Sequence, residues 1–366
     1  MKIAVVHDYF TQMGGAEKVA EELYNMLPGA DLFATVALQN KMPDSLRHVD
    51  VHTSWMQRLP KMNEYYRLYF PLYPFAVSSL DLSSYDLIVS SSSGYAKGVR
   101  AHPDAIHVCY CHTPMRWVWS YQSYSARESF GAGIRAFLPT LIHGLRRWDE
   151  GAARQPDHFI ANSQVVAKRI HEAYGRYAEV IAPPIEVHRF TLSLEQDDYF
   201  IILARLVSYK RIDLAIDAFS RLGKKLLVIG SGPALDDLKD QAGPSVRFMG
   251  RLPDREVDHL VSRCKALIFP GEEDFGMAPL EIAAAGRPTI AFRAGGAVET
   301  IRENVTGLFF DEQTPEALMD AVQRFEDQEW DPHTIRQHAE QFSSQVFRTR
   351  FASFLRRIGV TVAASV

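Results

Sequence analysis

The chain has 366 residues, which is longer than one hydrophobic core usually supports, so we expect two domains of roughly 180 residues each. Its hydrophobic content of 47% and charged content of 23% are those of an ordinary globular protein. A net charge of −4 without a long basic run argues against a nucleic-acid-binding protein. Three cysteines are too few for a disulfide framework, no secretory signal is visible, and no apolar run of about 18 residues could span a membrane. We therefore expect a protein of the cytoplasm.

The first half alternates short apolar runs with helical segments, which predicts a parallel sheet covered on both faces. A buried strand at residues 3–6 leads into a loop that ends in Gly14 and Gly15, where a helix begins. Such a unit can form a cradle of backbone amides for a phosphate, although a plain loop is equally consistent with two glycines. The dinucleotide fingerprint G-x-G-x-x-G is absent, which argues against a nicotinamide enzyme.

Polar side chains follow two of the predicted strands. The serines at 90–93 come after a strand at 87–90, and a polar loop is favoured there over a hydroxyl-lined turn at a binding site. His112 ends the strand at 107–111, at the same sheet edge as the Gly14-Gly15 loop. It could hydrogen-bond a substrate hydroxyl or polarise a phosphate, and a structural histidine is the alternative. Cys109 and Cys111 alternate on that strand without a second ligand pair, so they do not predict a metal site.

Residues 55–77 are dense in aromatic and basic side chains, and the prolines at 71 and 74 prevent one long helix. Tyrosine and tryptophan at the level of lipid headgroups, with Arg58, Lys61 and Arg67 facing anionic lipid, would suit a membrane interface. Packing of the aromatic side chains in the core is equally consistent with the composition.

A polar stretch without periodicity, residues 186–198, is typical of a linker. It separates a first domain at 1–185 from a second at 199–340, and we expect an amphipathic helix within 341–366 to cross back to the first domain. The second domain again alternates strands and helices, and Arg205 and Lys210 lie in the loop after its first strand. As a planar fork and a point charge they could hold a diphosphate, although an ordinary exposed basic loop is the alternative.

The stretch from Phe269 to Phe292 places Glu273 in a loop after a strand and Glu281 close to the start of a helix. Pro279 is expected at the first position of that helix, with Glu281 in its first turn near the positive end of the helix dipole. A second glycine loop at 295–296 opens another helix. Helix N-termini at one sheet edge can bind an anion, and carboxylates beside them can accept hydrogen bonds from sugar hydroxyls. A phosphorylated, polyhydroxylated ligand fits both requirements, whereas either glutamate alone is more simply a solvated side chain.

Taken in order, these motifs resemble those of the retaining GT-B glycosyltransferases of family 4. The second half carries Ala-Arg-Leu and Lys-Arg after its first strand, then GSGP, GEEDFGMAPLE, AAGRPTIAF, AGGAVETI and TGLFF. The first half adds HDYFTQMGGAEKV, CHTPMRW and ANSQ. In their particular form, the first-half motifs are similar to those of bacterial mannosyltransferases of O-antigen (lipopolysaccharide) and exopolysaccharide assembly.

The resemblance implies two Rossmann-like α/β domains that face each other across a cleft, with a nucleotide sugar held mainly by the second and an acceptor by the first. It implies that Arg205 and Lys210 bind the diphosphate and stabilise the leaving group. Glu273 would contact the hydroxyls of the donor sugar, Glu281 the ribose, and His112 the transferred sugar.

The resemblance also implies a set of further contacts with the donor, through backbone amides for the most part. These are at Gly14, Gly15, Phe275, Gly276, Met277, Ala278, Gly295 and Gly296. Arg211 stands where the family often has glycine after the lysine, and it could offer a further cation.

The activity that the resemblance implies is retaining transfer of a hexose, best assigned as mannose from GDP-mannose, without a metal ion. The acceptor would be a lipid-linked or growing oligosaccharide in bacterial surface polysaccharide synthesis. The protein would then work in the cytoplasm, in peripheral contact with the inner face of the cytoplasmic membrane. A sugar-nucleotide epimerase of the same architecture and a non-catalytic scaffold that binds nucleotide sugars are the alternatives.

Overall fold

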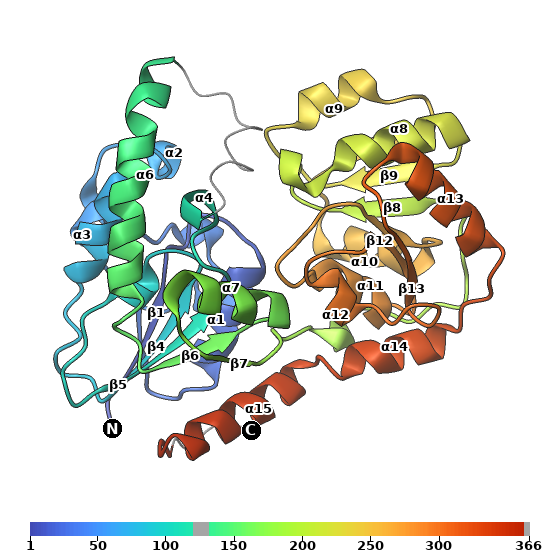
Figure 1. The fold of residues 1–366 in the computed structure, drawn as a ribbon. Helices are drawn as coiled ribbons and strands as arrows, with labels where there is room; N and C mark the ends of the chain where they lie inside the picture. Colours follow the sequence, from blue (N-terminus) through green and yellow to red (C-terminus); the bar gives the residue numbers. More distant parts are fainter. Residues whose placement is uncertain (120–131, 362–366) are drawn as a thin grey trace. The chain divides into compact units, whose positions relative to one another are not determined.

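The computed structural model describes residues 1–119 and 132–361. Contacts divide the chain into two compact units, which we call unit 1 (Met1–Pro184 and Phe347–Val366) and unit 2 (Ile185–Val346). Each unit is built on a parallel β-sheet with helices on both of its faces (Figure 1). The expected fold class, two Rossmann-like parallel-sheet domains, is confirmed.

The sheet of unit 1 has seven strands in the order β3-β2-β1-β4-β5-β6-β7, and all neighbours pair in parallel. The strands are β1 (Ile3–His7), β2 (Asp31–Ala34), β3 (Val51–Thr53), β4 (Leu87–Ser92), β5 (Ile106–Cys111), β6 (His158–Ala161) and β7 (Ala178–Val180). The order reverses between β1 and β4, and the carboxyl ends of strands at such a switch point are where open α/β sheets bind ligands.

Helices cover both faces of this sheet. One face carries α1 (Gly15–Asn25) and α15 (Ser344–Arg357), and the other carries α3 (Tyr73–Ser78), α4 (Arg116–Trp119) and α6 (Ala132–Ala152). The other helices of the unit are α2 (Met62–Tyr65) and α7 (Gln164–Tyr174), with 3₁₀ turns η1 (Gln39–Lys41), η2 (Asp44–Leu46), η3 (Trp55–Arg58), η4 (Phe70–Leu72) and η5 (Ala96–Gly98). Phe347 and Phe351 of α15 are fully buried in the core of unit 1, so this last helix completes a domain that begins at the N-terminus.

A buried ion pair fixes α6 on its face of the sheet. Lys97 Nζ lies 2.5 Å from Asp149 Oδ1, and both side chains are at most 1% exposed. Trp119 Nε1 and Tyr174 Oη each donate to Asp149 Oδ2 at 2.7 Å. Removing one partner would leave an uncompensated buried charge, so the cluster holds η5, α4, α6 and α7 in one arrangement.

The sheet of unit 2 has six strands in the order β10-β9-β8-β11-β12-β13. The strands are β8 (Phe200–Leu203), β9 (Leu226–Ile229), β10 (Val246–Gly250), β11 (Leu267–Phe269), β12 (Thr289–Phe292) and β13 (Gly307–Phe310). The order reverses between β8 and β11, which defines the switch point of this unit.

Helices also cover both faces of the unit 2 sheet (Figure 1). They are α8 (Ile212–Leu222), α9 (Leu235–Gln241) and α13 (Pro315–Glu326) on one face, and α10 (Asp254–Arg263), α11 (Met277–Ala284), α12 (Ala297–Thr300) and α14 (Pro332–Glu340) on the other, with 3₁₀ turns η6 (Val187–Arg189) and η7 (Ser208–Lys210).

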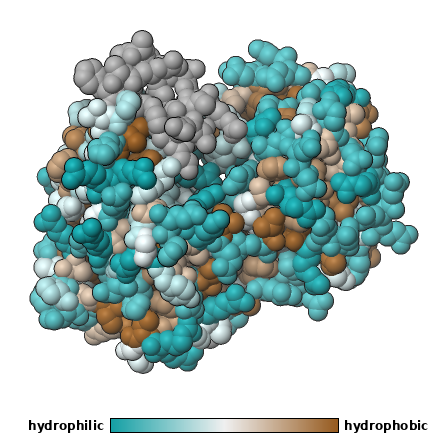
Figure 2. All heavy atoms as spheres, in the orientation of Figure 1, coloured by the Kyte–Doolittle hydropathy of each residue, from teal (hydrophilic) through white to brown (hydrophobic). Residues whose placement is uncertain are grey.

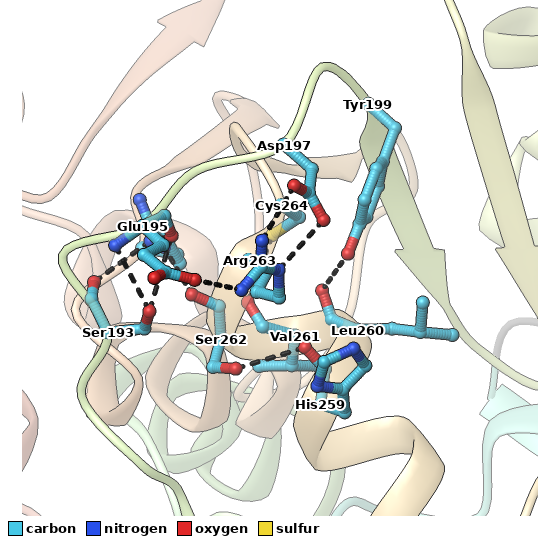
Figure 3. Close-up of polar contacts among 11 residues, drawn as sticks. Ser193, Glu195, Asp197, Tyr199, His259, Leu260, Val261, Ser262, Arg263 and Cys264 are labelled. Atoms are coloured by element: carbon cyan, nitrogen blue, oxygen red, sulfur yellow. Dashed lines mark hydrogen bonds and ion pairs between the residues drawn. The ribbon is translucent and has the colours of Figure 1, made fainter.

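The segment expected as a linker, residues 186–198, belongs to unit 2 and is attached to it by polar contacts. Arg263 at the end of α10 donates to both oxygens of Asp197, at 2.9 and 3.0 Å, and to Glu195 (Figure 3). Arg287 donates to backbone carbonyls of the same segment. The polar composition that suggested a flexible connection therefore reflects side chains that hold this segment against α10.

Candidate functional site

Four loops of unit 2 meet at the carboxyl edge of its sheet, and glycines allow their backbones to approach. A Cβ atom at Gly232, in the loop after β9, would lie 2.1 Å from the carbonyl oxygen of Leu206 in the loop after β8. A Cβ atom at Gly271, in the loop after β11, would lie 2.6 Å from Cα of Lys210. Real Cβ atoms do not approach backbone so closely, so only glycine fits at these two positions.

The glycine loop after β12 packs against the loop after β11 in the same way. The N–H of Gly296 donates to the carbonyl of Glu273 at 2.8 Å. A Cβ atom would lie 2.2 Å from that carbonyl oxygen if placed at Gly295, and 2.2 Å from Cα of Phe275 if placed at Gly296. Gly295 also has a φ of 59°, in the left-handed region that favours glycine.

An ion pair lies at the switch point of this sheet. Lys210 Nζ, in the loop after β8, is 2.7 Å from Glu273 Oε1, in the loop after β11, and the side chains are 16% and 21% exposed. The structure thus brings together a residue expected to bind the diphosphate and the residue expected to contact the hydroxyls of the donor sugar. Because both remain accessible, a ligand with a phosphate and hydroxyl groups could exchange its own contacts for this pair.

Two more of the expected residues lie near this pair in sequence, one in the loop after β8 and one on the helix that follows the loop after β11. Arg205 is exposed at the start of the loop after β8, and Glu281 is half-buried on α11. Glu281 also contributes to the electrostatic environment of Arg189, although Asp258 and Asp254 contribute more. Neither of these positions tests the roles that the sequence suggests for Arg205 and Glu281.

The start of α11 differs from the prediction. The helix begins at Met277, with Gly276 before it at a φ of 82°, so Pro279 occupies the third helical position and Glu281 the fifth. Proline is tolerated there because its missing N–H is still one of the unpaired donors of the first turn. The prediction that Glu281 lies in the first turn, near the positive end of the dipole, is therefore wrong, and Met277 and Ala278 take those places.

Phe275 does not present its side chain to this edge. It is 5% exposed, and its ring lies 6.1 Å from the ring of Phe342, which indicates that the side chain packs in the interior. Any contact of Phe275 with a donor would therefore be made by its backbone.

Arg211, which the sequence suggests as a further cation, contacts neighbouring polar side chains in the structure. Its guanidinium donates to both oxygens of Asp213, at 3.2 to 3.3 Å, and to Gln313 at 3.4 Å. Its φ of 52° is left-handed, which explains why glycine suits this position. Arg211 thus tolerates a strained backbone while its charge is neutralised by a neighbour on α8.

In unit 1, β4 is longer than the sequence suggested. The serines at 90–92 belong to this strand and are buried, so the prediction of a polar loop is wrong for them. Their hydroxyls have partners: Ser90 Oγ lies 2.8 Å from His107 Nε2, and Ser91 Oγ lies 2.8 Å from His112 Nε2 and 3.1 Å from His7 Nδ1. Histidines on the adjacent strands satisfy these hydroxyls, and this makes serine acceptable in a central strand.

His112 lies at the carboxyl end of β5, close to the switch point between β1 and β4. Burial, with a smaller contribution from His7, lowers its pKa to about 3, so the imidazole is neutral near pH 7. A neutral imidazole can exchange hydrogen bonds with a hydroxyl but cannot supply a positive charge to a phosphate. Of the two ligand roles that the sequence suggests for His112, this favours a hydroxyl partner over a phosphate, and it does not bear on the alternative of a structural histidine.

Sequence reasoning missed two acids beside the Gly14-Gly15 loop. Asp8 accepts hydrogen bonds from the backbone N–H groups of residues 93, 95 and 96, at 2.6 to 2.8 Å, and so shapes the turn after β4. Glu17, at the third position of α1, is 3% exposed, and its Oε2 has no hydrogen-bond partner among the described residues. Two sequence features could have indicated these acids. Asp8 comes directly after a buried strand, and Glu17 lies in the first turn of the first helix.

Residues 55–77 show features of both interpretations of the sequence, which were packing in the core and exposure at a membrane interface. Met56, Met62, Tyr73, Ala76 and Val77 are buried in the core of unit 1, whereas four large hydrophobic side chains are exposed. The exposed set is Trp55 at 43%, Tyr65 at 41%, Leu68 at 67% and Phe75 at 68%. The visible face of unit 1 shows hydrophobic and hydrophilic atoms intermingled (Figure 2).

Two classes of feature are absent from the part of the chain that the structure describes. No helix within residues 1–119 and 132–361 is long and apolar enough to cross a membrane. In the same ranges, no three His, Cys, Asp or Glu side chains are grouped so that they could hold a metal ion.

Comparison with known families agrees with these two units. Residues 185–342 match the family model "Glycosyl transferases group 1", and residues 13–189 match "Glycosyltransferase Family 4". The two matches together span residues 13–342, and the chain belongs to the GT-B glycosyltransferases of group 1/family 4.

Individual relatives are more distant. The GDP-mannose-dependent alpha-(1-6)-phosphatidylinositol monomannoside mannosyltransferase of Mycobacterium tuberculosis is 27% identical over 219 residues, which cover 51% of this chain and 56% of the relative. The glycogen synthase of the same species is 30% identical over 193 residues, which cover 48% and 46%. The chain thus spans about half the length of the curated relatives it matches. Anabaena HepE, solved in complex with UDP, shares the fold at a TM-score of 0.72 and 18% identity, over 98% of this chain and 100% of that chain.

Proposed function

We propose that the protein is a retaining hexosyltransferase that moves mannose from GDP-mannose to a lipid-linked or growing oligosaccharide in bacterial surface polysaccharide synthesis. The observation that carries this proposal is the pair of Lys210 and Glu273 at the switch point of the unit 2 sheet. A sugar nucleotide requires a cation for its diphosphate and an acceptor for its sugar hydroxyls within a few ångströms of each other. This pair supplies both, beside backbone held close by the glycine loop at 295–296.

In this reaction the bond between the sugar C1 and the diphosphate oxygen breaks, and a bond from the acceptor oxygen to C1 forms on the same face. The proton of the acceptor hydroxyl goes to the departing diphosphate. Arg205 and Lys210 would stabilise the negative charge that develops there, since preorganised cations lower the energy of such a transition state. The backbone at Gly14, Gly15, Gly295 and Gly296 and the start of α11 would add hydrogen-bond donors.

The remaining residues would position the donor. We assign Glu273 to the hydroxyls of the transferred sugar, Glu281 to the ribose and His112 to a further sugar hydroxyl. Phe275, Gly276, Met277 and Ala278 would contribute through the backbone at the start of α11. No step in this scheme requires a metal ion or another cofactor.

The identity of the donor is proposed from the resemblance of the motifs and from relatives whose names specify GDP-mannose, while HepE was solved with UDP. A thermal-shift screen with GDP-, UDP- and ADP-sugars would discriminate between bases, because a ligand that binds only the folded state raises the melting temperature. We expect GDP-mannose to give the largest shift.

The proposal predicts that Arg205→Ala and Lys210→Ala each lower turnover by a factor of about 100 or more, because each removes a cation from the leaving group. Matched controls are Arg255→Ala and Lys239→Ala, which remove exposed charges from α10 and α9. Circular dichroism would establish that all four variants fold. Full turnover in both loop variants would overturn the assignment.

Two alternatives make different predictions. A sugar-nucleotide epimerase would produce an epimer from donor alone, without an acceptor. A non-catalytic scaffold would bind nucleotide sugar tightly and would glycosylate no acceptor from the organism's glycan pathway. Incubation with donor alone, and then with lipid extracts, separates the three functions.

We also propose that residues 55–77 contact the membrane surface that carries a lipid-linked acceptor. The exposed side chains of this segment include both hydrophobic and basic groups, with Arg58, Lys61 and Arg67 against a single acid, Glu64. Lys61 lies over the ring of Tyr65 and Arg67 over the ring of Tyr66, so the cations accompany the aromatic groups. Such a surface fits a layer of anionic headgroups above lipid tails.

A further inference from the structure

We infer that Glu17, His7 and Ser91 form a relay that determines whether Nδ1 of His112 accepts or donates a hydrogen bond. These three residues are positioning residues, because they act on a ligand only through His112. They come from α1, β1 and β4, and His112 follows β5, so the relay crosses the carboxyl edge of the unit 1 sheet at its switch point.

The geometry is that of two successive buried hydrogen bonds, with the carboxylate of Glu17 at a longer, charge–charge distance from His7. Glu17 Oε1 lies 4.0 Å from His7 Nε2, His7 Nδ1 lies 3.1 Å from Ser91 Oγ, and Ser91 Oγ lies 2.8 Å from His112 Nε2. Exposure is 3% for Glu17, 2% for His7, 0% for Ser91 and 8% for His112. Water therefore does not compete for these contacts, and each proton in the chain constrains the next.

Other titratable groups near the relay are few and already engaged. Asp8, next to His7, is occupied by three backbone N–H groups of the turn after β4. The ring of Tyr110 lies 5.3 Å from His112, but its hydroxyl donates to the carbonyl of Ile181. Glu17 on α1 is therefore the acid that faces His7.

The hydroxyl of Ser91 has one proton, so it donates to one histidine and accepts from the other. The carboxylate of Glu17 favours a proton on Nε2 of His7. With only that proton, His7 Nδ1 accepts from Ser91, Ser91 accepts from His112 Nε2, and His112 Nδ1 is left as an acceptor.

A second proton on His7 reverses the chain. His7 Nδ1 then donates to Ser91, Ser91 donates to His112 Nε2, and the single proton of the neutral His112 imidazole moves to Nδ1, which becomes a donor. The protonation state of His7 is thereby transmitted to a ring nitrogen on the far side of Ser91. If Glu17 is neutralised, the Nδ1–H tautomer of His7 competes with the Nε2–H tautomer. The order of donors and acceptors along the relay is then no longer fixed.

For the ligand, the relay determines whether a hydroxyl donates a hydrogen bond to Nδ1 of His112 or accepts one from it. With His7 singly protonated, Nδ1 binds a hydroxyl that donates. Identifying that hydroxyl as part of a sugar rests on the proposed function, whereas the relay itself does not.

The direct test is ¹⁵N NMR of histidine-labelled full-length protein, which reports the protonated nitrogen of each imidazole as the pH is changed. We expect the tautomer of His112 to switch when His7 takes up its second proton. In Ser91→Ala the switch should be lost, and in Glu17→Gln it should move or become incomplete. Ser90→Ala is the matched control, because Ser90 is buried in the same strand but contacts His107.

The relay is overturned if His112 keeps one tautomer throughout the titration of His7, or if Ser91→Ala switches as the wild type does. Far-UV circular dichroism would verify that the variants are folded, and Glu17→Gln provides a second readout if Ser91→Ala does not fold.

Activity gives an independent readout. The pH profile of kcat/KM should show a step that accompanies the tautomer switch of His112. Ser91→Ala should lower kcat/KM by about tenfold and remove the step, as expected for loss of one directed hydrogen bond. A tautomer switch without any sugar transfer would sustain the relay and refute the proposed function. Transfer without a switch would refute the relay alone.

Discussion

At the scale of single residues, Gly296 shows how closely the loops of unit 2 approach each other. Its Cβ would meet the backbone of Phe275 at 2.2 to 2.5 Å, and backbone cannot yield as a flexible side chain can. We predict that Gly296→Ala displaces this loop, lowers the free energy of unfolding by about 1 to 3 kcal/mol, and weakens nucleotide binding. Urea unfolding and calorimetric titration would measure the two effects.

Gly144→Ala is the control for this substitution. Gly144 is exposed on α6, and a Cβ there would meet nothing within 4 Å. Alanine should be neutral or stabilise the helix by up to about 1 kcal/mol. Similar losses of stability in the two variants would show that the close approach at Gly296 is unimportant.

The buried histidines of unit 1 predict how stability depends on pH. Burial lowers the pKa of His107 to about 4 and that of His112 to about 3. Both lie below the value of about 6.5 expected in the unfolded chain, so the unfolded state binds more protons as the pH falls. Stability should be fully present above about pH 6.5 and should decrease towards pH 4, by up to about 1.4 kcal/mol per pH unit for each histidine.

Urea unfolding at pH 7 and pH 5 would measure this slope. His107→Gln should reduce it, because the variant removes one group that takes up a proton only on unfolding. An unchanged slope would mean that other groups account for the acid sensitivity.

At the scale of elements, α15 contributes buried side chains to the core of unit 1 although it lies at the other end of the chain. Phe351 is fully buried in the core formed with α1 and the sheet. We predict that Phe351→Ala lowers the free energy of unfolding by about 3 to 5 kcal/mol, from lost burial and the remaining cavity. Arg350→Ala, at an exposed neighbouring position, should change it by less than about 0.5 kcal/mol.

Differential scanning calorimetry would locate the effect, because two units can unfold in separate transitions. The transition of unit 1 should move to lower temperature, while that of unit 2 should not. A shift of the unit 2 transition alone would contradict this assignment of α15.

The segment around α2 and α3 predicts binding to anionic membranes. Reversing Lys61 and Arg67 to glutamate should abolish flotation with liposomes that contain anionic lipid, because each basic residue near the surface contributes about 1 kcal/mol. The control, Arg147→Glu with Lys168→Glu, makes the same change of charge at exposed positions on α6 and α7. Equal recovery of the two double variants would count against membrane contact by residues 55–77.

Local patterns predicted most elements because periodicity and turn residues are encoded locally. The mainly apolar strand β1, for example, lies within one residue of its expected position at 3–6. The prediction was wrong at β4, where Ser90 and Ser91 were expected in a loop because their histidine partners are distant in sequence. It failed again at the start of α11, where the left-handed Gly276 rather than Pro279 determines the first turn.

At the scale of the whole molecule, the sequence predicted two Rossmann-like units and the loops that carry Lys210 and Glu273, since motif order reflects strand order. It could not predict that these two side chains form an ion pair, because that depends on β8 and β11 being neighbours in the sheet. Glu17 was missed for the same reason: its burial against His7 is a tertiary contact.

The central claim is that the loops after β8 and β11 hold the diphosphate of a nucleotide sugar. Isothermal titration of the full-length protein with GDP and UDP, for the wild type and for Lys210→Ala, tests this claim most directly. We predict that the wild type binds at least one of the two nucleotides and that Lys210→Ala weakens binding by about tenfold or more, while Lys239→Ala binds as the wild type does. Equal affinity in the wild type and Lys210→Ala, or no binding of either nucleotide by the wild type, would contradict it.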